Sequence, residues 1–167
     1  MRGIRILKIL LVLAVGLQAG FYAISNLVNI DGAFAAVAYV LSMADQAIYD
    51  EPVLPPITAP VLVGLALALI IAAESAIGVL CIAGAAKMWN ARAGGVAEFA
   101  RARTVAVFGC GLALLLWVGL FMAFGGALYQ MWQTEIGLAS LEGAFMYAVS
   151  SAVVLLFVNQ PEADPRS

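Results

Sequence analysis

One long apolar stretch, Pro60–Lys87, reads PVLVGLALALIIAAESAIGVLCIAGAAK and carries a single charged side chain, Glu74, before its final lysine. At about 1.5 Å per residue, an apolar helix of this length crosses a hydrocarbon core of about 30 Å. A carboxyl group inside that core costs about 2.5–3.5 kcal/mol on insertion scales. Glu74 therefore has either a function or a polar partner. The stretch predicts a transmembrane helix over residues 60–86.

The composition extends this prediction to the whole chain. Of its 167 residues, 65% are hydrophobic and 11% are charged, and the mean hydropathy is +1.05. A soluble domain is about 25% charged, so this chain has too little polar surface to cover itself in water. Three more apolar segments lie at residues 4–24, 104–124 and 138–158. We therefore predict a single transmembrane domain over residues 1–167, with four spans.

The basic residues orient these spans. Every lysine and arginine lies in the N-terminal head, in the loop 87–103 or in the C-terminal tail: Arg2, Arg5, Lys8, Lys87, Arg92, Arg101, Arg103 and Arg166. The loop 25–59 and the link before residue 138 have none. By the positive-inside rule, both termini are predicted to be cytoplasmic. The fold class is all-α: an integral membrane bundle of four antiparallel transmembrane helices. The basic head also resembles a signal peptide, but no small-x-small cleavage site follows it, so we expect a retained first span.

The predicted outer loop, residues 25–59, is acidic and ends in the proline-rich string DEPVLPPITAP. Within it, residues 32–43 (GAFAAVAYVLSM) are too few to span a membrane but long enough for a short interfacial helix. Asp31 is a candidate N-cap for that helix. Tyr129 and Trp132 are expected at the outer interface, as in an aromatic belt.

Polar side chains at matching depth suggest a partner for Glu74. Counting from the outer start of each span places Glu74 about 21 Å deep, and Ser150 and Ser151 about 18 Å deep. We therefore expect a serine hydroxyl to meet a neutral Glu74 carboxyl that donates a hydrogen bond, if the second and fourth spans touch. Gln18, in the first span, is a candidate for a bond to another helix. The functional alternative for Glu74 is a proton relay or ion site.

The small residues and the absence of certain residue types limit the functions that the chain can have. Gly16 and Gly20 form a GxxxG pair, which lets helix backbones approach closely, either within the chain or between subunits. Cys81 and Cys110 lie in apolar runs and are expected to behave as small hydrophobes. The chain has no histidine and no recognisable catalytic or phosphate-binding pattern. We therefore expect no enzymatic activity, cofactor or metal site, and no nucleic-acid partner, since no basic cluster is interleaved with aromatics.

The chain resembles a known family at several motifs. The string Val37–Met43 (VAYVLSM), the span around Glu74, the glycine pair Gly125-Gly126, which we expect to form a turn, and Met131–Thr134 (MWQT) are similar to the domain of unknown function family numbered 2165. That family has a histidine where this chain has Tyr39, and an acidic residue where this chain has Ala127. The resemblance implies a small four-helix protein of the bacterial inner membrane and implies no activity.

Three functional hypotheses remain open. The first is an accessory or scaffold protein that packs with itself or with a larger membrane complex, surrounded by membrane lipids. The second is a carrier or channel for protons or a small solute that uses Glu74. The third is a quinone- or lipid-binding subunit of a redox enzyme, with an aromatic pocket formed by Phe108, Trp117, Phe121 and Phe124.

Overall fold

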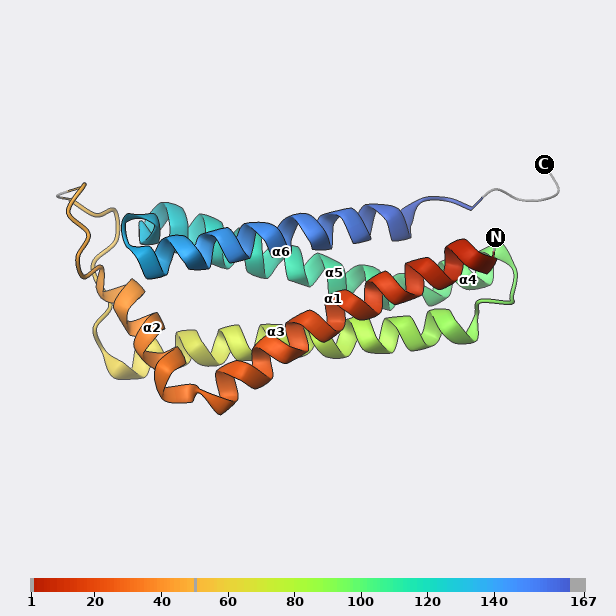
Figure 1. Cartoon of the computed structure of the whole chain (residues 1–167), viewed down its shortest axis with the longest axis horizontal. Coiled ribbons are helices and arrows are strands. Elements are labelled where there is room, and N and C mark those ends of the chain that lie inside the picture. Colours follow the sequence, from red (N-terminus) through yellow and green to blue (C-terminus); the bar gives the residue numbers. More distant parts are fainter. Residues whose placement is uncertain (1, 50, 163–167) are drawn as a thin grey trace.

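Helices are the only regular elements in residues 2–49 and 51–162, the part of the chain that this computed structural model describes. Four helical stretches are long and apolar enough to cross a membrane, namely Arg2–Val28, Pro60–Asn90, Val96–Leu128 and Glu135–Asn159. They lie side by side along the long axis of the molecule (Figure 1). The predicted all-α fold with four long apolar helices is confirmed. In order, the elements are α1 (Arg2–Val28), α2 (Ile30–Ser42), α3 (Pro60–Asn90), α4 (Val96–Ala102), α5 (Thr104–Leu114), the π-helix η1 (Leu115–Leu128), the 3-10 helix η2 (Met131–Gln133) and α6 (Glu135–Asn159).

The helices extend beyond the spans predicted for them. In place of the predicted loop over residues 87–103, α3 continues to Asn90 and α4 begins at Val96. Lys87 lies in the last turn of α3, where a cation is favoured by the helix dipole. Gly125 and Gly126 lie inside η1 and do not form the expected turn. The length of the apolar run therefore underestimates the length of the helix, because the helical hydrogen bonds continue into the polar residues that follow.

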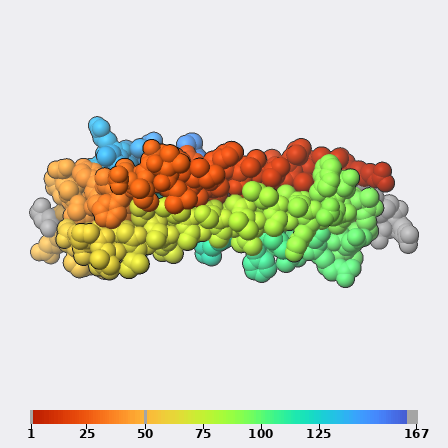
Figure 2. Space-filling model, turned by 90° about the horizontal axis from the view of Figure 1, so that it is seen from below, coloured from red at the N-terminus to blue at the C-terminus, as the bar shows by residue number. Residues whose placement is uncertain are grey.

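A short helix, α2, occupies the predicted outer loop, and only Asn29 separates it from α1. It begins one residue before Asp31, so the N-cap position falls on Asn29 and the prediction that Asp31 caps the helix is wrong. Asp31 lies in the first turn instead, where the helix dipole favours an acid. Through Phe34 and Leu41, α2 packs in a small cluster with Val63 of α3. Figure 2 shows α2, in orange, lying against the first part of α3, in yellow.

Glycines bring α1, α3 and α5 into close contact. A Cβ placed on Gly16 would lie 2.8 Å from the Cys81 Cβ, and one on Gly78 would lie 3.3 Å from the Gly20 Cα. A Cβ on Gly84 would lie 2.5 Å from the Ala106 nitrogen. The GxxxG pair of α1 therefore packs against α3 of the same chain, which settles the alternative that the sequence leaves open.

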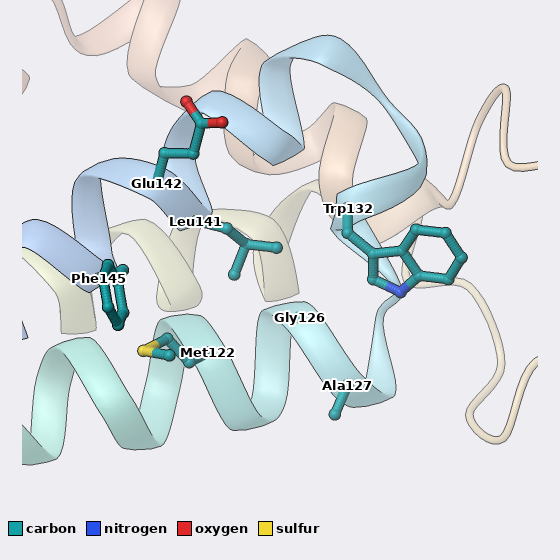
Figure 3. A pocket seen from close by; sticks show the side chains of 7 residues that line it. All are labelled: Met122, Gly126, Ala127, Trp132, Leu141, Glu142 and Phe145. Atoms are coloured by element: carbon teal, nitrogen blue, oxygen red, sulfur yellow. The ribbon is translucent and has the colours of Figure 1, made fainter.

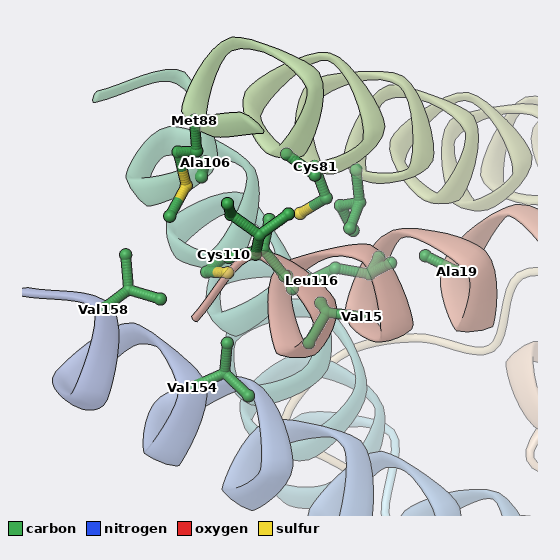
Figure 4. Close-up of a cluster of buried hydrophobic side chains, with 14 of the residues drawn as sticks. Val15, Ala19, Cys81, Met88, Ala106, Cys110, Leu116, Val154 and Val158 are labelled. Atoms are coloured by element: carbon green, nitrogen blue, oxygen red, sulfur yellow. The ribbon is translucent and has the colours of Figure 1, made fainter. Parts of the chain in front are cut away.

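The main core runs along the contacts of α1, α3, α5 and α6 (Figure 4). Its central side chains are small or sulfur-containing, and Cys81, Met88, Ala106 and Cys110 have at most 1% of their surface exposed. Both cysteines are free thiols, as expected for small buried hydrophobes. Many large apolar side chains point outward, as Phe108, Leu115 and Leu156 do, each about 70% exposed (68%, 70% and 70%). This distribution suits a protein whose exterior meets lipid.

Candidate functional site

Glu74 is buried between helices and has a polar partner on α1. Its side chain is 2% exposed, and its Oε2 accepts a hydrogen bond from Asn26 Nδ2 at 2.9 Å. The glycine contacts between α1 and α3 allow this pairing because they hold the two backbones close together. Asn26 lies on α1 because that helix continues to Val28, past the predicted end at residue 24. The carboxyl group therefore ties α3 to α1.

The serines predicted to meet Glu74 lie elsewhere. Ser150 Oγ donates a hydrogen bond to the Tyr147 carbonyl of its own helix at 3.1 Å. Ser151 is buried in α6, which packs mainly on α5 and η1, whereas Glu74 lies between α3 and α1. The prediction of a Glu74–serine bond is wrong because equal depth does not make two helices neighbours.

Other polar side chains on α1 form a second link across the protein. Tyr22, one turn before Asn26, hydrogen-bonds through its hydroxyl to the Tyr147 hydroxyl of α6. The Tyr147 ring in turn packs edge-on against Trp117, with 5.1 Å between ring centroids. Gln18 lies one turn before Tyr22, is half-buried, and makes no side-chain hydrogen bond within the described residues. Sequence reasoning missed Tyr22, Asn26 and Tyr147, although the i, i+4 spacing of Gln18, Tyr22 and Asn26 marks a polar stripe on one helix face.

The four aromatic residues of the predicted quinone or lipid pocket do not converge. Trp117 is buried at 4% exposure and stacks at 5.2 Å between ring centroids with Phe121. Phe108, however, is 68% exposed on α5. Phe124 packs near Tyr129 at the end of η1. Trp117 therefore acts as a packing residue between η1 and α6.

We call the end of the molecule that carries Asp31, Asp45, Glu51, Glu135 and Glu142 the acidic end. There, the segment after α2 is tied to the connection between η1 and α6. Gln46 Nε2 donates to the Tyr129 carbonyl at 2.8 Å, and Gln133 Oε1 accepts from the Ile48 backbone nitrogen at 2.8 Å. Trp132 stacks edge-on against Tyr49, with 5.7 Å between centroids.

Tyr39 lies near this junction, on α2. Its hydroxyl donates a hydrogen bond to Asp45 Oδ2 at 3.1 Å. Desolvation raises the pKa of Tyr39, and the hydrogen bond and the charge of Asp45 act in the same direction. The phenol is therefore held in its neutral, donating form. Asp31 is exposed and lies at the other end of α2 from Tyr39.

We call the opposite end, which carries Arg2, Arg5, Lys8, Lys87, Arg92, Arg101 and Arg103, the basic end. Arg5 is 5% exposed and forms a salt bridge to Glu162 at 2.6 Å. Lys8 is 2% exposed, and its Nζ donates to the Gln160 carbonyl at 2.9 Å. Arg103 donates to the Val158 carbonyl at 3.0 Å. Lys8 and Arg103 thus satisfy carbonyl groups at the C-terminal end of α6, where the helix dipole favours positive charge.

An apolar groove lies between η1 and α6 near the acidic end. Its volume is about 460 Å³, within the usual range for ligand sites. Figure 3 shows Leu141 pointing toward η1 and Glu142 pointing away from it, at the rim. Met122, Gly126 and Ala127 of η1 form one wall. The lining residues are Met122, Gly126, Ala127, Trp132, Leu141, Glu142 and Phe145.

The described part of the chain contains no group of three or more His, Cys, Asp or Glu side chains that could bind a metal ion. The polar groups that do gather are hydrogen-bonded pairs between helices, namely Glu74–Asn26 and Tyr22–Tyr147. The arrangement suits a protein that holds its helices in a defined register and presents one apolar groove.

Comparison with known proteins identifies a family for this chain. Residues 4–161 match the family described as predicted small integral membrane protein (DUF2165). No curated protein and no solved structure matches the chain. The match covers nearly the whole length and agrees with four helices apolar and long enough to cross a membrane. The chain therefore belongs to the DUF2165 family of predicted small integral membrane proteins.

Proposed function

We propose that this protein is a non-catalytic accessory component of a membrane complex, which holds a partner's transmembrane helix in the groove between η1 and α6. It would lie in the bacterial inner membrane as an antiparallel four-helix bundle. The separation of charge supports cytoplasmic termini, because Arg2, Lys87 and Arg101 lie at the basic end and the described residues of the acidic end include no lysine or arginine. The helix α2 would then lie at the outer interface.

The groove is the observation that carries this proposal. Ala127, a small and exposed residue, lines the groove, and small residues allow a second helix backbone to approach closely. Phe145 is 56% exposed beside it and offers a rigid aromatic contact. The GxxxG face of α1 is already used within the chain, so the groove replaces it as the surface for association.

Charge favours a particular kind of partner. Glu142 and Trp132 both line the groove, and Trp132 is 36% exposed, as expected for an interfacial residue. No lysine or arginine lies among the described residues of the acidic end. A partner helix with an arginine or lysine just beyond its outer membrane boundary would complement Glu142. We therefore assign the groove to such a helix.

The carrier hypothesis receives less support. Glu74 is paired with Asn26, and among the described residues it belongs to no group of three or more His, Cys, Asp or Glu side chains. A carboxyl group that hydrogen-bonds to a neighbouring helix has the polar partner that a buried acid needs, so its presence requires no proton pathway. If Glu74 carried protons, E74Q would abolish a flux that the wild-type protein shows in proteoliposomes.

The test is co-purification in mild detergent, followed by native mass spectrometry. We expect the wild type to retain a partner membrane protein, F145A to lose most of it, and E142Q to weaken it. F108A is the matched control, since Phe108 is 68% exposed on α5 and does not line the groove. Recovery of a strictly monomeric, partner-free wild type would refute the proposal, as would equal loss in F145A and F108A.

A further inference from the structure

We propose that Arg2 and Arg92, at the basic end, bind the phosphate of an anionic phospholipid. The two residues line one cavity of about 160 Å³ together with Ile6 and Ala93. Arg2 comes from the first turn of α1 and Arg92 from the connection between α3 and α4. The site is thus built by two elements that are distant in sequence, and it lies away from the groove of the proposed function.

The relative position of the two arginines is held by Arg5. Its Nη1 donates to the Arg92 carbonyl at 3.0 Å and to the Gly94 carbonyl at 2.7 Å. Arg5 lies one turn after Arg2 on the same helix and is itself 5% exposed. The connection that carries Arg92 is therefore fastened to the helix that carries Arg2.

The Arg92 side chain is also preorganised. Its guanidinium stacks over the Trp89 ring at 4.0 Å from the centroid, and its Nη1 donates to the Trp89 carbonyl at 2.6 Å. No other side-chain hydrogen bond of Arg92 occurs within the described residues, which leaves donors for a ligand. A planar guanidinium matches phosphate oxygens in geometry as well as charge.

The two arginines of this cavity form no ion pair within 4.0 Å among the described residues, and Glu98, whose carboxylate lies against Gly94, does not pair with either of them. In residues 2–49 and 51–162, the salt bridge of Arg5 with Glu162 is the one ion pair within 4.0 Å. Arg5 is thereby neutralised, whereas Arg2 and Arg92 have no acidic partner among those residues. Two such arginines lining one cavity are suited to an anion.

The surroundings select a lipid as the source of that anion. Ile6 forms part of the cavity, and Leu10 and Leu17 continue the same side of α1 toward the apolar interior, with 37%, 53% and 39% of their surfaces exposed. Trp89 is 44% exposed, as expected for an interfacial aromatic. A charged head beside a continuous exposed apolar track fits a phospholipid, whose chains would lie along α1.

The experiment is a titration of the purified protein with phosphatidylglycerol in neutral detergent, with bound lipid counted by native mass spectrometry. An arginine near a membrane surface contributes about 1 kcal/mol toward anionic lipid, so we expect R2Q and R92Q each to weaken binding about fivefold. The double variant should weaken it about 25-fold if the two contributions add. R101Q is the control, because Arg101 is exposed at the same end and does not line the cavity.

The outcomes separate the alternatives. An unchanged affinity for R101Q together with losses in R2Q and R92Q supports a defined site. Equal losses in all three variants overturn it, since the binding would then follow total charge. Inorganic phosphate is titrated in parallel, and if it displaces the lipid at comparable concentration, the lipid assignment is overturned. Arg2 lies in an exposed first turn, so R2Q tests the site without disturbing the fold.

Discussion

The close contact between α3 and α5 at Gly84 predicts a large difference between two glycine-to-alanine substitutions. A Cβ on Gly84 would lie 2.5 Å from the Ala106 nitrogen and 2.7 Å from its Cα, whereas one on Gly111 meets nothing within 4 Å. The obstructing atoms are backbone, so α3 and α5 must separate to reach an ordinary contact of 3.4 Å. Overpacking of this kind costs about 1–3 kcal/mol, and replacing a helical glycine returns about 0.5–1 kcal/mol. We therefore expect G84A to lose about 1–2 kcal/mol of stability and G111A to gain slightly.

The assay is unfolding in neutral detergent micelles by titration with a denaturing detergent, followed by circular dichroism. A second readout comes from the thiols. Cys81 and Cys110 lie in the same α3–α5 seam and are 0% and 1% exposed, so G84A should increase their rate of maleimide labelling. If G84A is as stable as G111A and its thiols stay protected, the α3–α5 seam is not packed as closely as the structure has it.

Three further predictions concern polar contacts. A double-mutant cycle between Glu74 and Asn26, with E74L and N26L, should give a coupling of about 0.6 kcal/mol, and no coupling would mean that the two do not pair. R5Q should destabilise the protein by about 3 kcal/mol in thermal unfolding, because it leaves Glu162 without its buried partner, and a change below about 0.5 kcal/mol would contradict this. In an ultraviolet pH titration referenced to Y39F, Tyr39 should ionise above the usual tyrosine range, and D45N should lower its pKa; no shift would refute the hydrogen bond.

The polar partners show how far sequence reasoning reaches. The apolar run around Glu74 predicts that this carboxyl has a function or a polar partner, and in the structure it is paired with Asn26. The depth count proposed a partner. This count led to Ser150 and Ser151, because the sequence gives the depth of a residue along its own helix but does not show which helices are neighbours. From the sequence, Asn26 is placed in the outer loop, because the apolar run ends before the last turn of α1. The position of the partner depends on the close α1–α3 contact at Gly16 and Gly78.

The basic residues give a second case. Their distribution was interpreted as a signal of orientation, and all seven that the structure describes do gather at one end. Sequence alone did not distinguish Arg5 and Lys8, which are buried and bind carbonyl groups, from Arg2 and Arg92, which line a cavity. Arg2 and Arg5 lie three residues apart on α1, so their side chains leave the helix in different directions. They therefore meet different neighbours and have different roles.

By itself, the sequence determined the all-α class, the four apolar helices and the family, because hydrophobic length and composition are local properties that lipid imposes on any spanning helix. The tertiary structure alone decided which polar groups pair, that the GxxxG face of α1 is used within the chain, and that η1 and α6 enclose a groove. The physical reason is that lipid tails are as apolar as the helices themselves. Close packing and interhelical hydrogen bonds therefore select the neighbours, and both depend on atoms that are distant in the sequence.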